Sequence, residues 1–313
     1  MPVVIDPGDG AAFGLDDLVA ALDAHRFDAR DEASLIDAAP LLARLGRHPT
    51  FLTDLAIAEL ETRCAGQSAT NSYGAQSFLL RPANGRYVLR ANFWPARDDA
   101  LTRASGEAAF LYDHAHDHNF PFLTYGYLGP GYWSDYFERG PDAVAGLPGE
   151  PAGLSFTGRR RLEPGQLMLY RMRRDVHRQL PPDAFSVSLN ILAYDPGQPW
   201  VEQYRFDVEA GTIAEGLTVT PSEVLVAVAA HLGGDAGAGL VQEFAGRHPC
   251  PRMRVTALDA MLSADPAAAW PVLEAAAGAA DRYVAGHARM QLDRLAKPLR
   301  YGAGPGPGGQ AAR

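Results

Sequence analysis

The residues best suited to chemistry in this chain are histidines at alternate positions in the run His114-Ala-His-Asp-His118. In a strand, alternate side chains share one face, so all three imidazoles point the same way. Two neutral imidazoles at i and i+2 can bind one divalent transition-metal ion. Pro121 argues against a helix here, because proline removes a backbone donor and restricts the residue before it. The run predicts a strand with His116 and His118 as ligands, and His114 beside the ligands or at the surface.

A third ligand must come from elsewhere. His177 follows the turn Leu162-Glu-Pro-Gly165 and the apolar run Gln166–Tyr170. This arrangement resembles the cupin superfamily, which has a His-x-His pair on one strand and, later, a Pro-Gly turn, a strand and a lone histidine. The resemblance covers roughly residues 75–209. It implies a β-barrel in which His116, His118 and His177 bind a metal ion.

The motifs depart from the family in two places. Cupins usually have a glutamate four or five residues after the His pair, and the stretch Asn119–Thr124 has no carboxylate. Arg171-Met-Arg173 stands where a Pro-x-Gly is usual, and the usual asparagine after the last histidine is absent. In lacking this glutamate, the chain resembles the three-histidine, thiol-dioxygenase branch of cupins. Glu138 on the next expected strand is the alternative ligand, which would give two or three histidines plus a carboxylate.

Arginines and tyrosines surround the expected site. The arginines near His177 form either a clamp for a carboxylate or phosphate or a solvated outer face of the barrel; they are Arg171, Arg173, Arg174 and Arg178. The tyrosines either line a pocket or belong to the core or rim; they are Tyr125, Tyr127, Tyr136 and Tyr170. We take Tyr136 and Arg173 as the candidate catalytic residues. Alternation also predicts an inward polar wall of Ser186, Ser188 and Asn190.

The elements that must position these residues follow from periodicity. Leucines at helical spacing predict helices near residues 15–22 and 52–60, and Pro40 and Gly46 bound a short helix near Leu41–Leu45. Short strand-like runs follow, at residues 77–80, 86–90, 122–128, 132–138, 166–170, 185–192 and 203–206. Asn84-Gly85 between the first two runs predicts a hairpin. Many short strands with Gly/Pro turns predict a closed antiparallel sheet or sandwich.

The last third of the chain is expected to be helical. Thr220-Pro-Ser-Glu223 combines an N-cap, a proline at the first helical position and a capping-box glutamate. The spacing Met253, Ala257, Met261 recurs as Val284, Ala288, Leu292, which resembles HEAT-type repeats. The fold class is therefore α+β, a cupin-type antiparallel barrel or sandwich between two helical regions. The expected domains are residues 1–70 (helical), 71–212 (cupin-like), 213–298 (HEAT-like) and 299–313 (a Gly/Pro-rich disordered tail).

Composition narrows the function classes. The 313 residues carry a net charge of −9, which does not favour nucleic acid. No apolar run is long enough to span a membrane, and the N-terminus lacks the pattern of a signal peptide, so we expect a cytoplasmic protein. Cys64 and Cys250 match no zinc spacing. Lys297 is the only lysine, and alanine, glycine and proline are abundant, as in proteins of GC-rich bacteria.

Three functions follow from these patterns. The first is a non-haem Fe(II) oxygenase that acts with O2 on a small polar or amino-acid-like substrate, or on a peptide. The second is a redox-neutral Zn or Mn cupin that acts as an isomerase, lyase or hydrolase; Cu and Ni are further metals that imidazoles bind. The third is an adaptor whose C-terminal helices bind a protein partner. The use of 2-oxoglutarate as a co-substrate stays open. The formation of a homodimer, which is common among cupins, also stays open.

Overall fold

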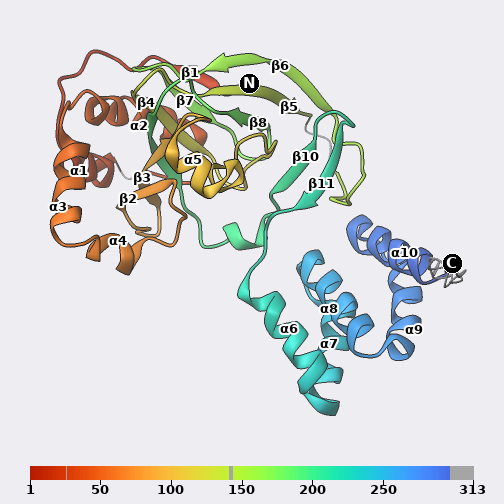
Figure 1. The fold of residues 1–313 in the computed structure, drawn as a ribbon. Coiled ribbons are helices and arrows are strands. Elements are labelled where there is room, and N and C mark those ends of the chain that lie inside the picture. Colours follow the sequence, from red (N-terminus) through yellow and green to blue (C-terminus); the bar gives the residue numbers. More distant parts are fainter. Residues whose placement is uncertain (26, 141–143, 297–313) are drawn as a thin grey trace, which may run out of the picture. The chain divides into compact units, whose positions relative to one another are not determined.

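The computed structural model describes residues 1–25, 27–140 and 144–296, so the expected tail at 299–313 lies outside the described residues. The chain divides into two compact units, Met1–Thr218 and Val219–Arg313. It has a mixed α+β fold with antiparallel sheets (Figure 1). Among the described residues, no helix has the length and apolar character needed to cross a membrane.

The first unit contains all the strands that the structure describes. Its helices are α1 (Leu15–His25), α2 (Glu32–Gly46), α3 (Phe51–Glu61), α4 (Ala65–Thr70), α5 (Ala100–Ser105) and the 3-10 turns η1 (Glu107–Phe110) and η2 (Gln198–Trp200). Its strands are β1 (Val3–Ile5), β2 (Ser77–Arg81), β3 (Tyr87–Trp94), β4 (Phe122–Leu128), β5 (Trp133–Arg139), β6 (Leu154–Arg161), β7 (Leu167–Tyr170), β8 (Asp175–Leu180), β9 (Ser186–Ala193), β10 (Tyr204–Asp207) and β11 (Thr212–Gly216).

A six-stranded sheet in the order β1-β7-β4-β9-β3-β2 forms the largest layer of this unit. One face packs against α1, α2 and α3 through leucines such as Leu22, Leu42 and Leu189. The other face carries a second cluster that includes Phe122, Tyr170 and Tyr136 of β5. Burial on both faces explains why β9 is buried at every position.

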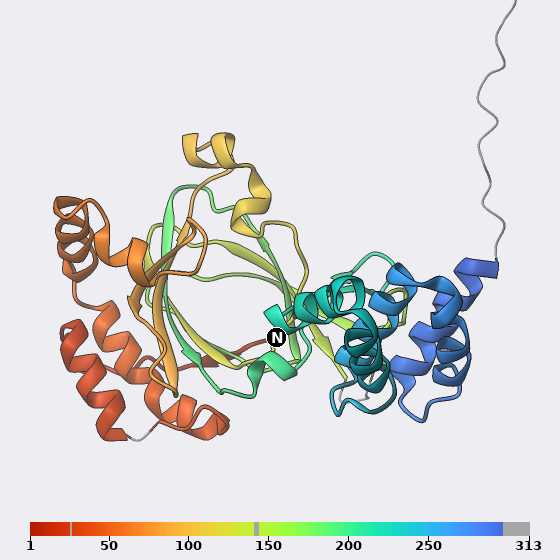
Figure 2. The same cartoon turned by 90° about the horizontal axis from the view of Figure 1, so that it is seen from below.

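The second face of the large sheet lies opposite a three-stranded sheet in the order β6-β5-β8 (Figure 2). Residues directly opposite each other on paired strands share a face, so the register places them in rows. One row is Val88, Leu192, Phe122 and Tyr170, and the next is Arg90, Asn190, Thr124 and Met168. On the facing sheet, Tyr136 of β5 is opposite His177 of β8. These rows place aromatic and polar side chains between the two sheets.

Several local predictions are confirmed and one is wrong. β2 and β3 form the expected antiparallel hairpin, and Gly85 at its turn has a positive φ of 88°. The break expected at Pro40 is wrong, because α2 continues from Glu32 to Gly46 with Pro40 inside it. The buried face of α2, which includes Leu35, Ala39 and Leu42, packs against the large sheet and outweighs the lost backbone bond.

The second unit consists of helices α6 (Pro221–Leu232), α7 (Gly234–Arg247), α8 (Pro251–Ala264), α9 (Pro266–Ala276) and α10 (Arg282–Ala296). The expected capping box at Thr220 and Glu223 is present at the start of α6. The helices enclose one apolar cluster, to which Met253 and Ala257 of α8 and Val284 and Ala288 of α10 contribute. The repeated apolar positions therefore share a core, whereas a HEAT-type repeat stays a prediction.

The close approach of α2 to β4 depends on Gly46. A Cβ atom at this position would lie 2.1 Å from the ring of the buried Tyr125. We predict that Gly46→Ala lowers the free energy of unfolding by about 1–3 kcal/mol, as for other overpacked cores. Urea denaturation measures the change. Gly74→Ala is the matched control, because an added Cβ there meets nothing within 4 Å, and an equal loss in both variants would contradict this account.

Candidate metal centre

The segment around His116 is not the regular strand that the sequence predicted. His116 forms isolated antiparallel bridges with His177 and with Arg205, and the residues on either side leave the ladder. The backbone amides of His116 and His177 each donate to the other's carbonyl over 3.0 Å. Because this pairing is reciprocal, it places the two side chains next to each other. His118 lies two residues further along, and its carbonyl accepts from the amide of Arg173 over 2.9 Å.

Asp117 locks the same segment from its other side. Its carboxylate accepts from the amide of Tyr204 over 2.7 Å, and its own amide donates to the carbonyl of Tyr204 over 3.2 Å. Arg139 forms an ion pair with this carboxylate at 3.5 Å. Burial raises the pKa of Asp117 to about 6. These contacts hold the residue between His116 and His118 away from the side on which their imidazoles lie.

The three imidazoles converge on one point. Nε2 of His177 lies 3.0 Å from Nε2 of His118 and 3.3 Å from Nε2 of His116. One ligand atom from each of the three histidines lies within 4.8 Å of the others. Two nitrogens that each lie about 2.1 Å from one ion are separated by about 3.0 Å at a right angle and about 3.4 Å at a tetrahedral angle. The spacing of these nitrogens therefore fits a single transition-metal ion.

The protonation of His116 suits a metal ligand. Its Nδ1 lies 2.8 Å from the carbonyl oxygen of His114, which can only accept a hydrogen bond. Nδ1 therefore carries the proton, and Nε2 presents a lone pair to the other two rings. His114 takes part through its backbone and is not in the three-histidine group.

Burial keeps all three imidazoles neutral. It lowers the pKa of His116, and it lowers the pKa values of His118 and His177 well below their usual value. The His118 ring packs against the rings of Phe120 and Phe122 at centroid distances of 5.1 and 4.8 Å, and no hydrogen-bond partner of its Nδ1 is present among the described residues. Neutral imidazole is the form that binds metals.

Gln179 is a residue of the site that the sequence reasoning missed. It is on β8 two residues after His177, and its amide Nε2 lies 3.2 Å from Nδ1 and 3.4 Å from Nε2 of that ring. Its buried Oε1 has no hydrogen-bond partner among the described residues. Rotation of the amide by half a turn lets Oε1 accept from Nδ1 of His177, the contact that orients metal-binding histidines elsewhere. The same-face spacing i, i+2 was the signal for this residue.

Phenols border the centre on the side of β5 and β7. The hydroxyl oxygens of Tyr136 and Tyr170 are 2.9 Å apart, and the Tyr170 ring lies 4.8 Å from the His177 ring. Burial raises the pKa values of both hydroxyls, so both stay protonated. Tyr136, which is opposite His177 in the pairing of β5 with β8, shares a hydrogen bond with Tyr170 in which either hydroxyl can donate.

The structure does not bring the other expected residues into the histidine group. Glu138 accepts from Arg174 over 2.6 and 2.8 Å, which holds its pKa low, at about 2. Arg171 pairs with Asp175 at 2.6 Å. The backbone amide of Arg173 donates to the carbonyl of His118, and its charge helps to lower the pKa values of Asp117 and Tyr204. Its buried Nε has no hydrogen-bond partner among the described residues. A ligand role for Glu138 and a catalytic role for Arg173 stay predictions.

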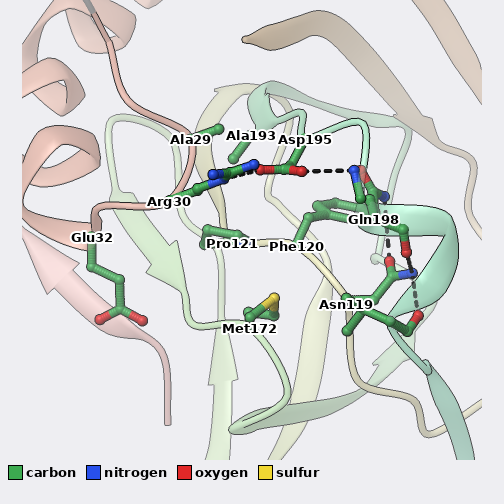
Figure 3. Close-up of a pocket in the computed structure, with 12 residues that line it drawn as sticks. Ala29, Arg30, Glu32, Asn119, Phe120, Pro121, Met172, Ala193, Asp195 and Gln198 are labelled. Atoms are coloured by element: carbon green, nitrogen blue, oxygen red, sulfur yellow. Dashed lines mark hydrogen bonds and ion pairs between the residues drawn. The ribbon is translucent and has the colours of Figure 1, made fainter. Parts of the chain in front are cut away.

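A cavity of about 300 Å³ lies near the centre, between the α1–α2 connection at residues 29–32 and the segment at residues 119–121 (Figure 3). Arg30 forms an ion pair with Asp195 at its edge, and Asn119 hydrogen-bonds to Gln198. Phe120 lines this cavity and also packs on the ring of His118. One aromatic side chain therefore contacts both the cavity and the histidine group.

Comparisons with known proteins add little. No protein-family model matches this chain, and no curated protein matches it. A solved structure described as "Crystal structures of DMSP lyases RdDddP and RnDddQII" is similar over 61% of this chain and 78% of its own, at 11% identity and a TM-score of 0.22. A likeness this low carries no argument about fold or function. The three-histidine group itself could hold a metal ion, and the identity of the metal is open.

The convergence of the three rings predicts their effect on metal content. Replacing His116, His118 or His177 by Ala should reduce the metal bound by the purified protein to background, because each removes one of three ligands. His114→Ala is the control and should keep the wild-type metal content, because His114 contacts His116 through its backbone carbonyl. Elemental analysis after loading and desalting measures both. Full metal content in the His118→Ala and His177→Ala variants would contradict the site.

A second prediction concerns Gln179. Gln179→Ala should weaken metal binding about 10–100-fold, because the imidazole of His177 loses the group that orients it. Competition with a chelator of known affinity measures the change. Gln166→Ala on the turn before β7 is the matched control, and unchanged affinity in Gln179→Ala would rule out the positioning role.

Proposed function

We propose that this protein is a metal-dependent enzyme of cupin type. The observation that carries the proposal is the convergence of three neutral imidazoles between two antiparallel sheets. The Nε2 atom of His177 lies 3.0 Å from that of His118 and 3.3 Å from that of His116. Three protein ligands leave coordination positions for other molecules, as in catalytic rather than structural metal sites. The buried imidazoles of His116 and His177 support a centre shielded from bulk water.

Within this class we favour a non-haem Fe(II) oxygenase acting on a small polar substrate. Bound iron would supply open positions at which substrate and O2 meet. The chain supplies the surroundings: the rings of Phe120 and Phe122 cover His118 and exclude water. The Tyr136–Tyr170 pair holds protons on its hydroxyl oxygens, ready to donate to an oxygen atom of the substrate.

The phenols also support a redox-neutral function with Zn or Mn. The hydroxyl oxygens of Tyr136 and Tyr170 are 2.9 Å apart, so a proton can pass from one phenol to the other. A lyase or isomerase needs such a proton path beside a polarised substrate. The helices of Val219–Arg313 are the expected surface for a protein or peptide partner, whichever reaction occurs.

Oxygen uptake separates these functions. Anaerobically Fe(II)-loaded protein should consume O2 when small carboxylic acids, amino acids or thiols are added one at a time, and Zn-loaded protein should not. Tyr136→Phe should lower kcat about 100-fold with unchanged metal content, because one proton donor is lost. Turnover of a substrate by Zn- or Mn-loaded protein without O2 would overturn the oxygenase and support the redox-neutral enzyme. A role that survives the combined His116→Ala and His118→Ala changes would favour the adaptor.

A further inference from the structure

The cavity beside Phe120 has an apolar wall. Phe120, Pro121 and Val201 line it, together with the exposed side chain of Met172. Its volume of about 300 Å³ is at the lower end of the range for small-molecule sites. Such sites combine an apolar lining with a few polar groups, and these polar groups fix the orientation of the ligand. The polar side chains around this cavity therefore indicate what it binds.

The positive charge at the cavity is neutralised within the protein. Arg30 forms an ion pair with Asp195, whose carboxylate also accepts from the amide of Gly197 over 2.7 Å. The hydrogen bond between the two side chains raises the pKa of Arg30 and lowers the pKa of Asp195. Both groups therefore stay charged, and the pair adds no net charge to the cavity.

Glu32 adds a negative charge that this pair does not balance. Its exposed side chain lines the cavity at the start of α2, and no ion pair of its carboxylate is found in the described part of the chain. The helix does not need Glu32 as a cap, because the side chain of Asp31 accepts from the amide of Ala33 over 2.9 Å. The charged lining residues are thus one cation, Arg30, and two anions, Glu32 and Asp195, which gives the cavity a net charge of −1.

The polar groups that remain are acceptors. Nδ2 of Asn119 donates to the carbonyls of Gln198 and Val201 over 3.2 and 2.9 Å, and its Oδ1 accepts from Nε2 of Gln198 over 3.3 Å. These bonds leave Oε1 of Gln198 and the carboxylate of Glu32 to accept from a ligand. Phe120 lies between these two acceptors in Figure 3, and the face of an aromatic ring attracts cations. A ligand that supplies N–H donors and a positive charge therefore complements the cavity.

We propose that this cavity binds a small organic ammonium ion, a primary amine with an apolar body, at a site separate from the metal centre. The ammonium group donates to the carboxylate of Glu32 and to Oε1 of Gln198, and the apolar body packs on Phe120 and Met172. None of the described residues that line the cavity is a histidine. The inference therefore stands apart from the proposed enzymatic function.

The test uses benzylamine, which is an ammonium ion at neutral pH, and benzyl alcohol as its neutral counterpart, with the full-length protein. NMR titration of the ligand signals measures Kd. Benzylamine should bind saturably to the wild type, and Glu32→Gln should raise its Kd about tenfold, because a charge-assisted hydrogen bond is lost. Phe120→Leu should raise it about threefold, because the aromatic face is lost while apolar bulk is kept. Benzyl alcohol should bind weakly, and equally to the wild type and Glu32→Gln.

The matched control is Asp37→Asn, which removes an exposed acid on the same helix that does not line the cavity and should bind benzylamine as the wild type does. Circular dichroism confirms that each variant is folded. The proposal is overturned by equal benzylamine affinity in Glu32→Gln and wild type, or by equal affinity of the wild type for benzylamine and benzyl alcohol. Benzylamine binding to Zn-loaded protein that is absent from the metal-free protein would place the amine on the metal and would also overturn it. If the protein binds no metal, the proposed function fails, and the Glu32→Gln comparison still decides the cavity.

Discussion

The candidate site depends on one short pairing, the reciprocal backbone bridge between His116 and His177. Two hydrogen bonds of 3.0 Å tie an irregular segment to the middle of β8. The bridge fixes which side each imidazole takes, because opposite residues in an antiparallel pair share a face. Asp117 closes the arrangement from the other side through Tyr204 and Arg139. The third imidazole, of His118, then needs only the alternation of an extended chain to reach the same point.

The polar character of the interior is the second constraint on the molecule. Buried polar groups without partners raise the free energy of a fold, and native proteins keep few of them. Here two such groups belong to the site, within the described residues: Nδ1 of His118 and Oε1 of Gln179. These unpartnered groups lower the stability of the ligand-free protein, so we interpret them as part of a binding site.

The sequence predicted the parts of the site that depend on spacing and missed those that depend on register. His116, His118 and His177 follow a motif, and the structure brings them together. Gln179 has the same-face spacing but carries no metal-binding signal of its own. Arg90 is far from the motif in sequence and comes to face the interior only through the pairing of β3 with β9 and of β9 with β4. The arginines beside His177 looked more suitable in sequence as an anion clamp. Carboxylates on β5 and β8, however, form ion pairs with three of them: Arg171, Arg174 and Arg178.

The central claim is that three histidine nitrogens bind one ion, and X-ray absorption spectroscopy of the metal-loaded protein tests it most directly. This account predicts a first shell of nitrogen or oxygen at about 2.0–2.2 Å with the multiple scattering of about three imidazoles. A first shell without imidazole scattering, or with one ring only, would contradict the account.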